Sequence, residues 1–147
     1  MRVSCEASAL ATSPVELRTI RYAGSVRVFV SGHGPLKADK TLITGRVGET
    51  LTLDQGKDAA RQVGLAVLAT VKDTLGSLDK VKRVVKLLGM VNSAPGFSGQ
   101  PQVIHGCSDL LVQVFGEAGR HARAAVGAPA LPMGVAVEVD AVVAIRR

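Results

Sequence analysis

The chain has 147 residues, of which 47% are apolar and 3% aromatic, and its formal net charge at pH 7 is +6. This length is typical of one domain with a substantial core, so we expect a single domain over residues 1–147. No apolar run approaches the ~18 residues of a membrane span, and the first residues lack the apolar segment of a signal peptide. We therefore expect a cytoplasmic protein with no membrane partner.

Cysteine and histidine are too sparse to suggest a disulfide framework or a metal centre. Cys5 and Cys107 lie far apart without a CxxC pair, which fits a reducing compartment, and Cys107 is interpreted as a small core residue. His33, His105 and His121 are scattered, without partners at ligand spacing. We predict no metal.

The positive charge favours anionic partners, either nucleic acid or small carboxylates. One Tyr, three Phe and no Trp leave few side chains that could stack on bases. A basic run is typical of a solvated strand face, although it could also contact phosphates; it comprises Lys80, Lys82, Arg83 and Lys86. RNA therefore stays as a partner that composition does not favour.

The first part of the chain predicts strands. Residues 17–21 and 26–31 flank the turn "YAGS" and are typical of a β-hairpin, with Ser31 ending the second strand at a loop. The segment "SGHGPLKADKT" then predicts a turn before a short strand around residues 42–47.

Two helices are predicted next. The first begins near Thr52, where "TLDQ" has the form of a capping box, and Gly76 supplies its stop. Its apolar residues recur at helical spacing: Ala60, Val63, Val67, Val71 and Leu75. The second helix begins at Pro101 and ends at "GEAG", with an apolar face: Ile104, Cys107, Leu110, Leu111, Val114 and Phe115.

The remaining segments predict three strands. The first strand lies in "LDKVKRVVKLLGMVNSAP", where Val81, Arg83 and Val85 alternate with residues of the other face. A short strand and a turn follow in "AVGAPALP". The last strand covers residues 135–145, where Val alternates with Glu138 and Asp140. The most economical arrangement is an α+β mixed sheet with both helices packed on one face. A closed homo-oligomer would cover the other face, which carries Glu138.

Two charged residues bound the apolar segment "HARAAVGAPALPMGVAVEVDAVV". Arg123 opens a strand, and a guanidinium binds a carboxylate through two parallel hydrogen bonds. Glu138 lies among β-branched residues, where a carboxylate can hold and deprotonate water. A structural ion pair of Arg123 with Glu138 or Glu117 is an equally good interpretation.

Together with "VSGHGP" and the helix–strand–helix middle, this segment resembles the RidA/YjgF family, also called L-PSP endoribonuclease-like proteins. The resemblance runs from about Leu17 to Ile145, and the interval from Arg123 to Glu138 matches that between the family's arginine and glutamate. It implies a chorismate-mutase-like fold assembled as a homotrimer, with clefts between neighbouring subunits.

The resemblance also implies an activity. Members of the family hydrolyse reactive enamine or imine acids to 2-keto acids and ammonia, without a metal or an organic cofactor. By this resemblance Arg123 binds the substrate carboxylate, Glu138 positions the attacking water, and Ser31 lines the pocket. We therefore expect an enamine/imine deaminase of the 2-iminobutanoate/2-iminopropanoate type, with no cofactor.

Two positions depart from the family pattern. Arg18 lies thirteen residues before Ser31, where active members often carry a pocket tyrosine, and it either strengthens a preference for anionic ligands or lies on the surface. His121 replaces the usual proline before "AR"; it could serve as a proton carrier, but a solvent-facing loop histidine is the favoured interpretation.

Two alternatives belong to other functional classes. An endoribonuclease or RNA-binding protein fits the family's older name and the positive charge, but no histidine pair is arranged for acid–base cleavage. Its binding should weaken steeply with salt. A non-catalytic trimer would instead bind a small carboxylate at Arg123 without turnover.

Overall fold

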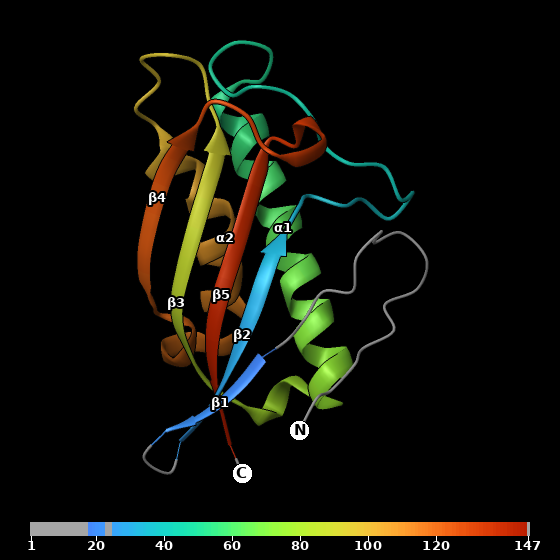
Figure 1. Ribbon diagram of the computed structural model, residues 1–147, viewed down its shortest axis with the longest axis vertical. Coiled ribbons are helices and arrows are strands. Elements are labelled where there is room, and N and C mark those ends of the chain that lie inside the picture. Colours follow the sequence, from blue (N-terminus) through green and yellow to red (C-terminus); the bar gives the residue numbers. More distant parts are fainter. Residues whose placement is uncertain (1–17, 23–24, 147) are drawn as a thin grey trace.

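The computed structural model describes residues 18–22 and 25–146. One mixed sheet runs through them in the order β1-β2-β5-β3-β4, with β3 and β4 parallel and every other neighbouring pair antiparallel (Figure 1). Its strands are β1 (Arg18–Tyr22), β2 (Ser25–His33), β3 (Val81–Asn92), β4 (Ala122–Ala128) and β5 (Val137–Ile145). The predicted mixed sheet is confirmed, with β1 and β4 at its edges.

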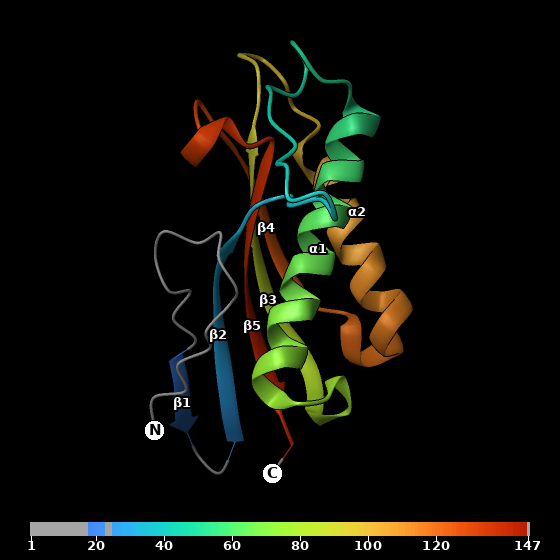
Figure 2. The same cartoon turned by 90° about the vertical axis from the view of Figure 1, so that its right-hand side faces the viewer.

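Two helices, α1 (Leu53–Leu75) and α2 (Gln100–Phe115), lie on the same face of this sheet (Figure 2). Three short 3-10 turns connect the elements: η1 (Leu78–Lys80), η2 (Gly116–Gly119) and η3 (Pro132–Gly134). The α+β class with both helices on one face is therefore confirmed. In the described part of the chain, neither helix is long and apolar enough to cross a membrane.

The limits of α1 follow from local chemistry. The Thr52 hydroxyl accepts a hydrogen bond from the Gln55 backbone N–H at 3.2 Å, and the Gln55 side-chain oxygen accepts one from the Thr52 N–H at 2.8 Å. These bonds satisfy two donors that a helix start leaves free. At the other end Gly76 takes a φ of 80°, in the left-handed region that glycine adopts readily. The predicted capping box and stop are confirmed.

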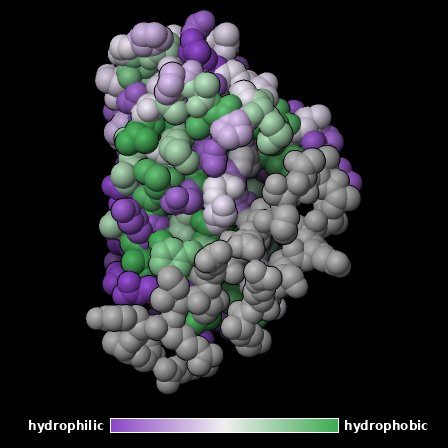
Figure 3. All heavy atoms as spheres, viewed as in Figure 1, coloured by the Kyte–Doolittle hydropathy of each residue, from purple (hydrophilic) through white to green (hydrophobic). Residues whose placement is uncertain are grey.

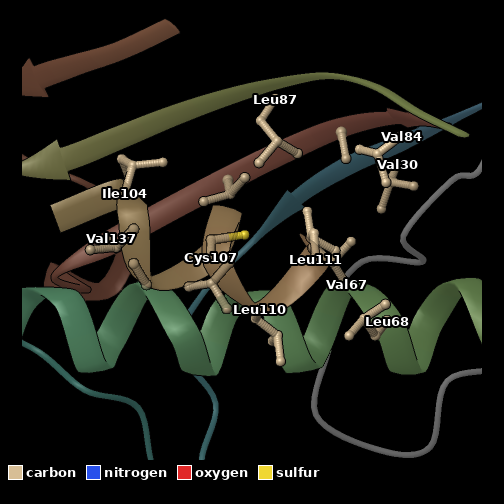
Figure 4. Packing of buried hydrophobic residues seen from close by; sticks show 14 of the residues in the cluster. Val30, Val67, Leu68, Val84, Leu87, Ile104, Cys107, Leu110, Leu111 and Val137 are labelled. Carbon is tan, nitrogen blue, oxygen red and sulfur yellow. The ribbon is translucent and has the colours of Figure 1, made fainter. Parts of the chain in front are cut away.

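The core lies between the helices and the sheet, and its side chains are drawn mainly from valine and leucine (Figure 4). Cys107 of α2 is fully buried there, next to side chains of α1 and the strands. Burial raises the pKa of the Cys107 thiol to about 12, with a smaller opposing effect of the Arg123 charge. The thiol is therefore neutral and serves as a core residue, as the sequence predicted.

The short strand predicted around residues 42–47 is wrong. That segment forms isolated bridges, such as Thr44 with Val135 and Val47 with Ser93, and no continuous ladder. Gly45 and Gly48 have φ values of 132° and 87°, and such backbone interrupts an extended run. The alternation predicted at the start of β3 is also wrong, because the pairing register with β5 shifts between Val81 and Arg83 and again between Val84 and Lys86.

Candidate functional site

Glu138 lies on the face of the sheet that the helices leave open. Its neighbours Val137 and Val139 are fully buried in the core beneath the helices, and side chains alternate along a strand. Glu138 itself is half-buried and is level with Met90 of β3. The sheet therefore presents this carboxylate to the surface opposite the helices, as the alternation in the sequence predicted.

An irregularity in β2 makes room for the Glu138 carboxylate. The register between β2 and β5 shifts between Val30 and His33, and Gly32 lies inside the shift. A Cβ atom built on Gly32 would overlap the Glu138 Oε1 atom, so any side chain at position 32 would displace the carboxylate. Ser31, the predicted pocket residue, is exposed directly beside Gly32.

His33 ties this irregular turn to α1. Its Nδ1–H donates to the Ser31 carbonyl at 2.7 Å, because a carbonyl can only accept. Its Nε2 then accepts from the Thr70 hydroxyl at 2.8 Å. Burial is the main cause that lowers the pKa of His33, which favours this neutral ring. The backbone carrying Ser31 and Gly32 is thus fixed from the helix side.

Arg123 lies at the other edge of the sheet and on the opposite face. Its Nη1 donates to the Ser108 hydroxyl of α2 at 3.1 Å. In β4 it is level with Leu87, which is fully buried, and the following Ala125 packs against the core. The Arg123 side chain therefore points to the helix-covered face and remains half-buried there.

Ser108 connects Arg123 to His121. The Ser108 hydroxyl lies 3.0 Å from His121 Nε2, and His121 Nδ1 lies 2.6 Å from the Gly119 carbonyl. Burial lowers the pKa of His121, and the Arg123 charge lowers it further against the opposing effect of the Gly119 carbonyl. His121 is half-buried and bonded at both nitrogens, so its interpretation as a solvent-facing loop histidine is corrected. Sequence reasoning assigned no role to Ser108 or Gly32.

Within one chain Arg123 and Glu138 do not meet. Arg123 is level with Leu87 of β3 and Glu138 with Met90, which separates them by about 10 Å along the strands and about 10 Å across two strand spacings. Their side chains also point to opposite faces. The structural ion pairs considered for Arg123 are not formed among the described residues, where Glu117 pairs with Arg120 at 2.8 Å.

The remaining predicted residue is Arg18. Its backbone lies in β1 opposite Phe29, and its side chain is outside the part of the chain that the structure describes. Cys5 lies outside the described residues altogether. Within 18–22 and 25–146 no three His, Cys, Asp or Glu side chains are grouped as a metal ion would need.

Apolar side chains gather on the sheet face that the helices leave open (Figure 3). Phe29 and Val126 are 39% and 45% exposed, and Leu88, Met90 and Val142 are half-buried between them. Both helices lie on the other side of the sheet, so this face is not covered by them (Figure 2). Its mixture of apolar surface with the Glu138 and Asp140 carboxylates suits an interface that contains a polar site.

This fold is that of a known family. Residues 6–143 match the family described as "YjgF/chorismate_mutase-like, putative endoribonuclease". The chain therefore belongs to the YjgF/chorismate mutase-like family, as the resemblance in the sequence indicated.

Relatives agree with this membership. The protein TCP17 of Trypanosoma cruzi is 50% identical over 119 residues, which cover 80% of this chain and 74% of that protein. The crystal structure of Atu1372 from Agrobacterium tumefaciens, of unknown function, has a TM-score of 0.80 at 42% identity, over 86% of this chain and 80% of that one. A "putative endoribonuclease" from Shewanella oneidensis has a TM-score of 0.81 at 29% identity, over 93% and 87%.

Proposed function

We propose that the protein is a cytoplasmic enamine/imine deaminase that hydrolyses small 2-imino acids to 2-keto acids and ammonia. In this proposal it acts as a homotrimer without a cofactor. Arg123 binds the substrate carboxylate, Glu138 holds the attacking water, and Ser31 lines the pocket. The observation that carries the proposal is the fit of the Glu138 carboxylate against Gly32, the chain neighbour of Ser31, on the sheet face that the helices leave open.

The separation of Arg123 and Glu138 supports a site shared between two copies. A small imino acid cannot reach both side chains of one chain while Arg123 is bonded to Ser108, because they face opposite sides of the sheet. The edge strand β4 of one copy, placed beside the open face of another, would bring an Arg123 to a Glu138. A closed ring of such contacts gives each copy one complete site.

The reaction requires these residues to orient the substrate and to transfer protons. Arg123 anchors the carboxylate and so orients the imine carbon toward Glu138. Glu138 accepts a proton from water as the water oxygen bonds to the imine carbon, and this proton passes to the imine nitrogen to give the carbinolamine. Glu138 then accepts the carbinolamine hydroxyl proton and delivers it to the amine nitrogen, so the C–N bond breaks and ammonia and the 2-keto acid form. Orientation is the main contribution, since such imines hydrolyse unaided in water.

The proposal is tested with 2-iminopropanoate, generated in place by an amino-acid oxidase acting on alanine and trapped with semicarbazide. Wild-type protein should suppress semicarbazone formation, whereas Arg123→Ala and Glu138→Gln should not. If wild-type protein leaves semicarbazone formation unchanged for this imine and for a bulkier one, the deaminase assignment fails. Binding of pyruvate at Arg123 without turnover would then indicate the non-catalytic carboxylate-binding trimer.

The second candidate is an RNA-binding protein or endoribonuclease. It is favoured by the name of the Shewanella oneidensis relative and by the exposure of Lys82, Arg83 and Lys86 at the start of β3. Binding through these side chains should fall steeply between low and high salt. Pyruvate binding at Arg123 should depend far less on salt than such a multi-phosphate contact.

A further inference from the structure

The Arg123 guanidinium is held by a chain of two hydrogen bonds, which we call the relay. It runs from Arg123 on β4 to Ser108 on α2 and on to His121 in the segment that precedes β4. We propose that Ser108 and His121 are positioning residues for Arg123, and that they hold its guanidinium in place only while His121 is neutral. This proposal rests on the proposed role of Arg123 as the carboxylate anchor.

The direction of every bond in the relay is determined by chemistry. The Gly119 carbonyl can only accept, so His121 Nδ1 carries the ring proton across the 2.6 Å contact. His121 Nε2 is then an acceptor, and the Ser108 hydroxyl donates a hydrogen bond to it at 3.0 Å. The Ser108 oxygen is left with its lone pairs free and accepts from Arg123 Nη1 at 3.1 Å. Each group has one consistent role.

This arrangement keeps one edge of the guanidinium out of the bond to Ser108. Arginine has five N–H donors in a planar fork, and a carboxylate binds best to two parallel ones. The bond to Ser108 engages Nη1, so the edge formed by Nε and Nη2 can still take a carboxylate in two parallel bonds. A guanidinium fixed in this plane loses less freedom when the ligand arrives, which favours tighter binding.

Protonation of His121 breaks the pattern. A cationic ring donates from both nitrogens, so Nε2 would present a proton to Ser108 and the hydroxyl proton would have to turn away. The imidazolium charge of His121 would also lie close to the Arg123 guanidinium, because both groups contact the Ser108 hydroxyl. Burial and the Arg123 charge lower the pKa of His121, so the neutral ring dominates at neutral pH. The relay should therefore fail as the pH falls through that lowered value.

The other titratable or charged groups near His121 do not replace Arg123 in this effect. Cys107 of α2 has a thiol pKa of about 12 and is neutral. Glu117 of η2 pairs with Arg120 at 2.8 Å, Asp109 of α2 pairs with Lys57 at 4.0 Å, and Lys86, level with Ala122, is exposed. Arg123 is the charged side chain that shifts His121, so the coupling between these two groups can be measured.

The test measures the affinity for pyruvate, the product of 2-iminopropanoate hydrolysis. NMR titrations give this affinity at a series of pH values from 5 to 8. Ser108→Ala should weaken pyruvate binding about tenfold and raise KM more than it lowers kcat, because a charge-assisted hydrogen bond is lost. Ser108→Thr should restore most of the affinity. His121→Gln should remove the weakening of wild-type binding at low pH, whereas His105→Gln, at an exposed position of α2, should not.

Equal pyruvate affinity of Ser108→Ala and wild type, or an unchanged pH dependence in His121→Gln, overturns the proposal. If Ser108→Ala does not fold, the ring nitrogen shifts of His121 replace it: Arg123→Ala should raise the pKa of His121, and an unchanged value overturns the coupling. Wild-type protein that binds pyruvate with this pH dependence but does not hydrolyse 2-iminopropanoate retains the inference and loses the proposed reaction. Wild-type protein that does not bind pyruvate overturns both.

Discussion

The Glu138 carboxylate lies directly against Gly32, in the space that a side chain at position 32 would need. The two residues belong to neighbouring strands, and the irregularity between Val30 and His33 in β2 brings them together. Position 32 therefore controls where the carboxylate lies without itself offering a polar side chain.

A methyl group at position 32 should disable the site while leaving the fold intact. Gly32→Ala pushes the Glu138 carboxylate out of its place against residue 32, and a displacement of about 1 Å can lower a rate about 100-fold. The matched control is Gly34→Ala, whose Cβ would meet Val135 at an ordinary contact distance of 3.5 Å. Semicarbazone trapping gives the rates and circular dichroism the fold. Equal rates for the two variants would show that the position of Glu138 does not limit turnover.

A site shared between copies should be restored by mixing two inactive variants. In each trimer that contains both Arg123→Ala and Glu138→Gln chains, about a third of the sites combine an intact Arg123 from one copy with an intact Glu138 from another. Co-expression of the two chains and purification of the mixed trimer should recover about that share of wild-type turnover. No recovery, with mixing confirmed by mass spectrometry, would place both residues of a site in one chain.

The stability of the protein should fall in mild acid because of His33. Burial lowers the pKa of His33 in the folded chain below the ordinary value of 6.5 that it has in the unfolded chain. Between these two values the unfolded chain binds the extra proton, so the contribution to stability is complete above pH 6.5 and decreases as the pH falls below it. Urea unfolding from pH 5 to pH 8 should show a shallower decrease for His33→Gln, and the wild-type profile for His105→Gln.

The capping box at Thr52 should contribute measurably to stability. Thr52→Ala removes the acceptor of the Gln55 N–H bond at 3.2 Å and should lower the free energy of unfolding by about 1 kcal/mol. Thr74→Ala is the control, since its hydroxyl bonds the Thr70 carbonyl inside the same helix and caps no free donor. A similar midpoint of urea unfolding for the two variants would contradict this role of Thr52.

Much of the fold could be predicted because its signals are local. Thr52, Gln55 and Gly76 specify the limits of α1 within a few residues of themselves, and the alternation of valines around Glu138 specifies the faces of β5. The expected strand at 42–47 is wrong because Gly45 and Gly48 have φ values of 132° and 87°, which interrupt the extended run.

The face of Arg123 could not be predicted, for a physical reason. β4 reads "ARAAVGA", and a strand built from small residues gives no contrast between its two faces. The support from Ser108 was hidden as well, because a half-buried serine between Cys107 and Asp109 resembles any helix residue near a boundary. Contacts between a helix and a strand edge depend on packing, which spacing along the sequence does not encode.

The two halves of the proposed site differ in how far apart their parts lie along the chain. Arg123, Ser108 and His121 come from one β3–α2–β4 unit, whose contacts can close over short loops. Glu138 and Gly32 come from strands near opposite ends of the chain, and joining them requires closure of nearly the whole fold. We therefore expect the carboxylate half to assemble last and to open first, so hydrogen exchange under mild denaturant should release the β2–β5 amides before those of β3 and β4. In mild denaturant the protein would then lose its activity while Arg123 was still held in place.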